Sequence, residues 1–160
     1  MKKIFYTDGS SKGNPGPGGY GVVEYDIQSN RIFYIYSEYF KNITNNQMEL
    51  KAILHVIKLA AADKENSYLV YSDSAYAVNS INIWMYGWAQ NGWVNSKKKP
   101  VENLDLIQEI YSYLEFPMEN FDLRKIDGHS GYLGNELADA LATGDMKKKE
   151  ELKHKYSILE

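Results

Sequence analysis

The order of structural elements in this chain is set by an early apolar run, Ile4-Phe5-Tyr6-Thr7, which ends in Asp8-Gly9-Ser10. Aromatic and β-branched residues of this kind favour a strand, and Asp-Gly is ordinary turn chemistry. A dense series of turn formers follows at Asn14-Pro15-Gly16-Pro17-Gly18-Gly19. We therefore expect a strand over residues 4–7 and then a loop.

Two further β-prone runs follow at residues 20–25 and 31–40. Both are rich in aromatic and β-branched residues, and the segment 26–30 between them suits a turn. The simplest interpretation is a three-stranded antiparallel meander at the start of a sheet.

A helical pattern begins at Asn46 and continues to Ala61, with apolar residues recurring at helical spacing. It predicts an amphipathic helix with Glu49 in its first turn. The next apolar run, residues 68–71, is continuous, as expected of a strand covered on both faces. It ends at Ser72-Asp73-Ser74, so an acidic residue again stands where a strand is expected to end.

The rest of the chain alternates helices, loops and one more strand. The predicted elements are a short helix from residue 75, a helix over 84–93, the basic loop Lys97-Lys98-Lys99, a helix over 102–114, a strand over 121–126, a glycine-rich loop over 127–134 and a helix over 135–142. This order predicts an α/β fold with a mixed five-stranded sheet, three antiparallel strands and then two parallel ones, and helices on both faces. We expect one domain over residues 1–145 and a charged C-terminal helix or tail over 146–160.

The composition fits a globular domain and narrows its chemistry. Of 160 residues, 44% are hydrophobic and 24% charged, which suits one compact core. There is no cysteine, so a metal must be held by oxygen or imidazole, and a reducing compartment is the natural setting.

No apolar run is long enough to cross a membrane, and the N-terminus turns polar too soon for a signal peptide, so we expect a cytoplasmic protein. The net charge of -3 argues against a non-specific nucleic-acid binder.

Four acidic residues stand near the ends of these elements, and each has an ordinary explanation on its own. Asp8 suits a turn, Glu49 suits the positive end of a helix dipole, and Asp73 suits an N-cap. Asp139 can face the same side of a helix as Asn135, which fits an exposed polar surface. Four carboxylates brought together would repel one another unless cations neutralised them, and hard oxygen ligands suit Mg²⁺. Taken together, the acids therefore predict a metal site.

The residues around these acids resemble ribonuclease H type 1, of the bacterial kind with a basic handle. The resemblance runs from about Ile4 to Ala142. It rests on Thr7-Asp8-Gly9-Ser10, Asn14-Pro15-Gly16-Pro17-Gly18-Gly19-Tyr20-Gly21, Thr44-Asn45-Asn46-Gln47-Met48-Glu49, Ser72-Asp73-Ser74, Gly128-His129-Ser130-Gly131 and Asn135-Glu136-Leu137-Ala138-Asp139. It implies a ribonuclease H-like fold and an endonuclease that hydrolyses the RNA strand of RNA–DNA hybrids.

The same resemblance implies two Mg²⁺ ions per active site, with Mn²⁺ as an alternative. Asp8 would bridge both ions, Glu49 and Asp73 would complete the shell, and Asp139 would hold the ion on the water side. Two metals about 4 Å apart activate the attacking water and stabilise the departing ribose 3′ oxygen, giving 5′-phosphate and 3′-hydroxyl ends. His129 would shuttle a proton or assist product release.

A set of substrate contacts is also implied. RNA differs from DNA in its 2′-hydroxyl and helix shape, and Asn14, Asn45 and Glu49 would read the minor groove beside the scissile bond. The handle, residues 84–99, would grip the DNA strand. The further contacts implied are Gly9, Ser10, Thr44, Gln47 and Asn135, with Trp84, Trp88, Trp93, Lys97, Lys98 and Lys99 in the handle. Aromatic residues at helical spacing are more commonly core, which is the alternative for Trp84 and Trp88.

The chain departs from this family at several positions that face substrate. Ala89-Gln90-Asn91 stands where relatives are usually basic, Asp127 where many carry a basic residue, and Gln47 where arginine is frequent. None is a metal ligand, so we expect activity with lower and more salt-sensitive hybrid affinity.

Two other functions remain open at this point. A relative of the same fold that acts on DNA, such as a transposase or junction resolvase, shares the carboxylates but not the context of Asn14 and Asn45. A catalytically silent hybrid-binding module is the other, although a binder gains nothing from mutually repelling acids that face phosphates. Nothing in the sequence demands more than a monomer.

Overall fold

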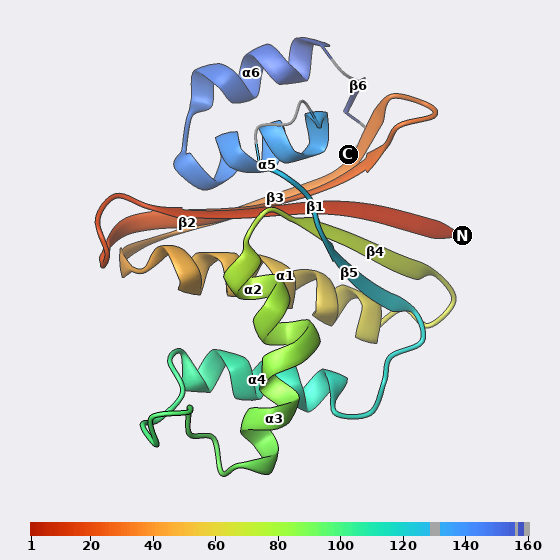
Figure 1. The fold of residues 1–160 in the computed structure, drawn as a ribbon. Helices are drawn as coiled ribbons and strands as arrows, with labels where there is room; N and C mark the ends of the chain where they lie inside the picture. The colour runs from red at the N-terminus through yellow and green to blue at the C-terminus, as the bar shows by residue number, and fades with distance from the viewer. Residues whose placement is uncertain (129–131, 156, 159–160) are drawn as a thin grey trace.

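The computed structural model describes residues 1–128, 132–155 and 157–158. A mixed sheet runs through its centre in the order β5-β4-β1-β2-β3-β6 (Figure 1). Its strands are β1 (Lys2–Ser11), β2 (Gly16–Asp26), β3 (Arg31–Ile43), β4 (Ser67–Ser72), β5 (Phe121–Lys125) and β6 (Ser157–Ile158).

The predicted α/β fold with five principal strands is confirmed. β1, β2 and β3 form the antiparallel meander, and β4 and β5 extend the sheet with parallel pairing beyond β1. The two-residue β6 adds a sixth strand that pairs in parallel with β3 at Arg31 and Ile32. Two residues carry no periodic pattern, so the sequence offered no signal for it.

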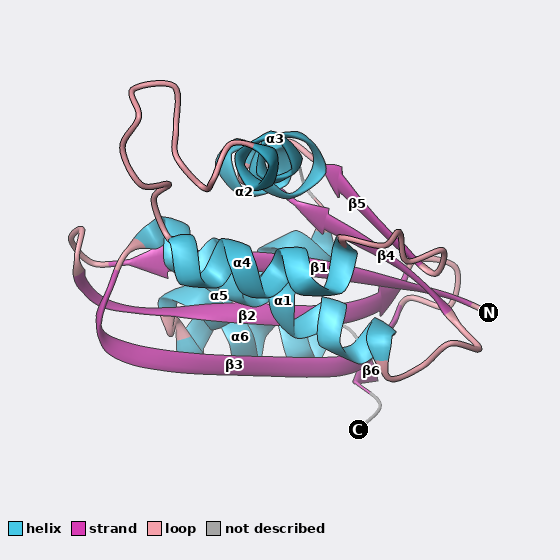
Figure 2. Ribbon diagram, turned by 90° about the horizontal axis from the view of Figure 1, so that it is seen from below, coloured by secondary structure: helices cyan, strands magenta, loops and turns pink. Residues whose placement is uncertain are grey.

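Helices cover both faces of the sheet, as the sequence predicts (Figures 1 and 2). On one face lie α1 (Asn45–Ala61), α2 (Ala75–Asn79), α3 (Met85–Gln90) and α4 (Leu104–Leu114). On the other lie α5 (Leu133–Thr143) and α6 (Met146–Lys155). The described residues contain no helix long and apolar enough to span a membrane.

Strand alternation divides the interior into two cores. Phe5 and Val22 are buried with α1 on one face, and Tyr6 and Val23 are buried with α5 on the other. Gly21 admits α5 closely, because a side chain there would overlap the Ala138 backbone. Both helical layers therefore pack against β1, which contains Asp8, and against β2, which pairs with it.

Strands β1 and β2 are longer than predicted. Asp8-Gly9-Ser10 is not a turn: β1 continues to Ser11, with Asp8 paired to Gly21. The glycine-rich segment from Gly16 belongs to β2 and pairs with the end of β1. Local turn propensity is overridden here by cross-strand pairing.

The helix predicted over 84–93 is also wrong in its bounds. One helical run extends from Ala75 to Gln90, through a π-helical stretch at Ser80–Trp84. It ends before Gly92 and Trp93, both of which have positive φ. Glu49 likewise lies beyond the first turn of α1, because the helix begins at Asn45, one residue earlier than predicted.

Candidate metal centre and nucleic-acid surface

Three of the four predicted metal ligands meet at one place. Asp8 lies within β1, Glu49 on α1, and Asp73 directly after β4. Because Thr7 pairs with Ser72 in the parallel β1–β4 ladder, the acids that follow them emerge side by side. One carboxylate oxygen from each of the three acids lies within 4.8 Å of the others.

Gly9 explains why α1 delivers Glu49 to this point. A side chain at Gly9 would overlap the backbone nitrogen of Glu49 and the backbone of Met48. The strand and the helix therefore touch at backbone level, next to Asp8. The Gly9 backbone N–H also donates to Asp8 Oδ1 at 3.0 Å, which orients that carboxylate.

Burial disfavours the ionised forms of the carboxyl groups in this cluster. Asp8 is 7% exposed and Glu49 is 5% exposed. Burial raises the pKa of Asp8, and the charges of Glu49 and Asp73 raise it further. Burial also raises the pKa of Glu49, partly offset by its hydrogen bond with Asp8.

A divalent cation fits this donor set. Glu49 Oε1 is buried without a hydrogen-bond partner among the described residues, which is costly unless something else binds it. Clustered carboxylate oxygens are the ligands that hard cations such as Mg²⁺ prefer. A bound cation would satisfy this oxygen and offset the repulsion among the three acids.

Asp139 lies beside the cluster rather than within it. Its side chain on α5 is close enough to Asp8 to raise the pKa of that carboxyl, but it is not among the three acids within 4.8 Å. Its Oδ2 lies 3.8 Å from Lys148 Nζ on α6. The sequence predicts only a charged C-terminal helix or tail in that region and gives no role to Lys148, because a lysine nine positions after an acid is no recognisable signal.

The predicted histidine, His129, lies outside the described residues. The described residue before it, Gly128, approaches Asp73: a Cβ there would lie 3.1 Å from Asp73 Oδ2. Asn135, on α5, is 4% exposed, and its Oδ1 has no hydrogen-bond partner within the described part of the chain. A buried amide oxygen without a partner is unusual, because buried polar atoms are normally hydrogen-bonded.

The predicted substrate residues before α1 are brought together. Asn14 Oδ1 accepts from the Asn45 backbone N–H at 3.3 Å, which joins the β1–β2 loop to the start of the helix. Thr44 is the N-cap of α1, and Gln47 completes a capping box with it. Thr44 and Gln47 therefore have structural roles that the sequence analysis missed, although T-x-x-Q is the signal for such a box.

The handle places its three tryptophans differently. Trp84 is 43% exposed, whereas Trp88 and Trp93 are half-buried against the core. The Trp84 and Trp88 rings lie 6.1 Å apart and line an open hollow of about 620 Å³ that also includes Lys98. Trp93 packs edge-on against Tyr111 at 5.3 Å. The alternative core role thus describes Trp88 in part but not Trp84.

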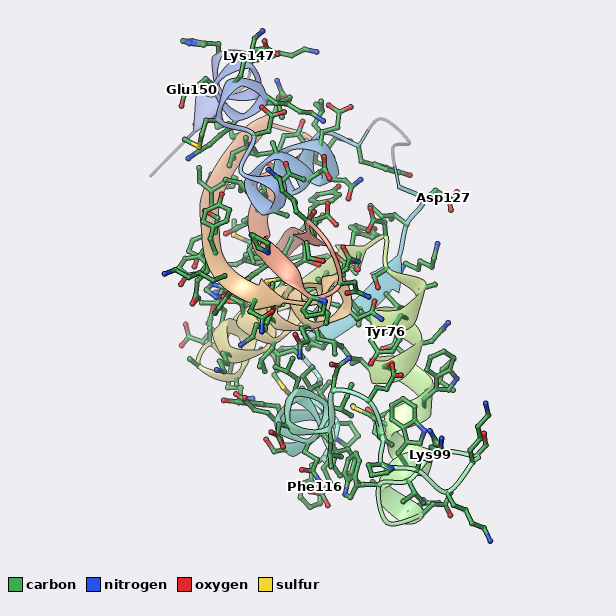
Figure 3. The ribbon with its side chains drawn as sticks, turned by 90° about the vertical axis from the view of Figure 1, so that its left-hand side faces the viewer. Tyr76, Lys99, Phe116, Asp127, Lys147 and Glu150 are labelled. Carbon is green, nitrogen blue, oxygen red and sulfur yellow. The ribbon has the colours of Figure 1, made fainter. Side chains whose placement is uncertain are left out.

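The basic cluster of the handle is a tight turn organised by Asn95. Its Oδ1 accepts from the backbone N–H groups of Lys97 and Lys99, at 2.9 and 3.1 Å. Lys98, at φ 61, lies between them, and all three lysines are exposed. Figure 3 shows Lys99 at the end of the molecule opposite α6, so this positive surface lies far from Lys147.

Comparison with known proteins identifies the family. The model of the RNase H family matches residues 1–147. The ribonuclease H of Polynucleobacter asymbioticus is 40% identical over 139 residues, which cover 87% of this chain and 86% of that protein. The ribonuclease H of Francisella philomiragia is 41% identical over 139 residues, which cover 87% of each protein.

Solved structures of ribonuclease H domains have the same fold as this chain. The solution structure of the PFV RNase H domain superposes with a TM-score of 0.75 at 27% identity, covering 93% of this chain and 94% of that one. The crystal structure of LC11-RNase H1 in complex with an RNA/DNA hybrid has a TM-score of 0.63 at 26% identity, covering 91% and 98%. With this fold, this acid cluster and these relatives, the chain belongs to the type 1 ribonuclease H family of nucleases.

Proposed function

We propose that this enzyme hydrolyses the RNA strand of RNA–DNA hybrids by a two-metal-ion mechanism, leaving 5′-phosphate and 3′-hydroxyl ends. The observation that carries the proposal is the meeting of buried Asp8 and Glu49 with Asp73 at the junction of β1, α1 and β4. A relative of the same fold was solved with an RNA/DNA hybrid, which supports this substrate.

In this proposal Asp8, Glu49, Asp73 and Asp139 bind two Mg²⁺ ions, with Mn²⁺ as an alternative. When bound, such ions activate the attacking water and stabilise the oxygen that leaves. Asp8, Glu49 and Asp73 would together hold the ions, with Asp8 proposed as the ligand that both would share. Asp139, at the edge of the cluster, would help to hold the ion on the side of the attacking water.

His129 supplies the proton chemistry in this proposal. An imidazole titrates near neutral pH, so it can take a proton from the water side and return it during product release. Support comes from Gly128, its described neighbour, which approaches Asp73.

The surface around Asn14 and Asn45 is proposed to distinguish RNA from DNA. The Asn45 backbone N–H donates to Asn14 Oδ1, which fixes the Asn14 side chain beside the start of α1. In this proposal Asn14 and Asn45 form the rim of the site, and their side chains reach 2′-hydroxyl groups in the minor groove. Gly9, Ser10 and the buried amide of Asn135 add contacts close to the acids. Thr44 and Gln47 position this rim through the capping box.

The handle is proposed to hold the DNA strand. Exposed Trp84 and the half-buried Trp88 offer ring faces, and Lys97, Lys98 and Lys99 offer positive charge to phosphates. Trp93 packs edge-on against Tyr111 and is proposed to hold the handle against α4. We propose that the enzyme works as a monomer in the cytoplasm, where a chain without cysteine meets no redox constraint.

The proposal is tested with four labelled substrates of one sequence: RNA–DNA, DNA–DNA, RNA–RNA and single-stranded RNA. Each is incubated with the protein in Mg²⁺ and in EDTA, and the product ends are mapped. We expect cleavage of the RNA strand in the hybrid alone, lost in EDTA, with 5′-phosphate ends. Cleavage of DNA would favour a transposase or resolvase activity, and hybrid binding without cleavage would favour a silent binding module.

A further inference from the structure

Lys148 is placed beside the candidate metal centre by the turn between α5 and α6. Gly144 ends α5 with φ 74, the left-handed conformation that reverses a chain after a helix. Asp145 then caps α6, because its Oδ1 accepts from the Lys148 backbone N–H at 3.0 Å. Buried Leu152 anchors α6 in the hydrophobic cluster that also contains Leu137 and Leu141 of α5. The first turn of α6 therefore has a fixed position over the end of α5.

This position brings the positively charged Lys148 close to Asp139, one of the proposed metal ligands. Lys148 Nζ lies 3.8 Å from Asp139 Oδ2, with side-chain exposures of 39% and 31%. Asp139 in turn lies beside Asp8, whose pKa is raised by burial and by the charges of Glu49 and Asp73. The neighbouring Lys147 is exposed (Figure 3). It makes no ion pair with any described residue.

We propose that Lys148 is an internal counter-cation, which neutralises Asp139 in the metal-free protein and competes with the divalent ion for that carboxylate. The inference rests on the proposed function, since it requires Asp139 to be a metal ligand. An ammonium group and a divalent ion repel each other, so both cannot hold one carboxylate at full strength. Lys148 therefore sets the metal concentration at which the water-side position fills. It acts as a positioning residue and not as a catalytic one.

Metal binding in the absence of substrate tests the inference directly. Mn²⁺ and Mg²⁺ are titrated calorimetrically into the wild-type protein and into Lys148→Met, Lys148→Arg and Lys147→Met at low salt. We expect Lys148→Met to bind metal about twofold to fivefold more tightly, the range for a partly exposed ion pair. Lys148→Arg should restore the wild-type affinity, and Lys147→Met should not change it. High salt should shrink the difference, because the pair is screened.

A second readout separates this role from a merely structural one. The Mg²⁺ concentration that half-saturates hybrid cleavage should fall by the same factor in Lys148→Met as the calorimetric affinity rises. Equal or weaker metal affinity in Lys148→Met, compared with Lys147→Met, overturns the inference even if the wild-type enzyme cleaves hybrids. If the wild-type protein binds no metal and cleaves nothing, the proposed function fails together with it.

Discussion

Gly9 of β1 lies directly against the backbone nitrogen of Glu49 on α1, with no room for a side chain between them. The contact joins β1 to α1, the first helix that packs on the sheet. It lies one residue from Asp8, so the same contact that packs the core also sets the distance between two carboxylates. Stability and metal binding are therefore coupled at this glycine.

Gly9→Ala should destabilise the protein by about 3 kcal/mol or more, because the added methyl group must displace the helix backbone. The same displacement moves Glu49 away from Asp8, so hybrid cleavage should fall with stability. Urea unfolding and cleavage rates measure both. The matched control is Gly87→Ala on α3, where a Cβ would meet open space and helix propensity favours alanine. Equal stability of the two variants would contradict the close packing.

Local sequence patterns predicted most of the strands and helices, but they did not show how the backbone brings the acids together. Asp8 was expected in a turn because its neighbours, Gly9 and Ser10, are turn formers by local propensity. The actual strand depends on pairing with Gly18–Gly21, which is tertiary information. The parallel register of Thr7 with Ser72, which sets Asp8 beside Asp73, is equally invisible to periodicity.

The family resemblance predicted which acids form the site, whereas local sequence patterns did not. It named Asp8, Glu49, Asp73 and Asp139 as a group, and the structure brings the first three together with Asp139 beside them. It could not reveal Lys148, because that residue depends on the particular turn at Gly144 and Asp145. The spacing of Thr44 and Gln47 is sufficient to predict their capping box, whereas the family resemblance implied only substrate contacts for them.

Thr44→Ala should lower the free energy of unfolding by about 1 kcal/mol, because it removes the hydroxyl that accepts the Gln47 backbone N–H. Thr44→Ser keeps that hydroxyl and should retain most of the stability. Urea unfolding compares the three proteins, and the KM for hybrid reports whether the rim at Asn45 moves. An unchanged unfolding free energy in Thr44→Ala would show that the cap contributes nothing.

Replacing Lys97, Lys98 and Lys99 together by alanine should weaken hybrid binding and make it less dependent on salt. Each lysine that contacts a phosphate contributes about 1 to the slope of log affinity against log salt concentration. Binding is measured in EDTA over a salt series, so that cleavage does not interfere. Lys64→Ala, in the loop between α1 and β4, is the control and should leave the slope unchanged. A triple variant with the wild-type slope would mean that the handle does not reach the hybrid.

His129→Ala should slow turnover by about a hundredfold without abolishing it, since general acid–base catalysis contributes on that scale. The carboxylates remain, so metal-dependent cleavage persists. Single-turnover and steady-state rates over a pH series measure the loss and test whether the titration near neutral pH disappears with the imidazole. Complete inactivity, equal to that of an Asp8 variant, would assign His129 a larger part than proton transfer.

Asp8→Asn should abolish cleavage and yet stabilise the metal-free protein at neutral pH. In that protein the pKa of Asp8 is raised above its unfolded value by burial and by Glu49 and Asp73. A raised folded pKa means that the folded state binds the proton more tightly, so its contribution to stability is complete below about pH 4 and is lost as the pH rises. The neutral amide removes this loss. In EDTA, unfolding free energy should therefore fall with rising pH less steeply in Asp8→Asn than in wild type. Mg²⁺ should reverse their order at pH 7, because it stabilises only a site that binds it; parallel curves in EDTA would contradict the electrostatic cost assigned to Asp8.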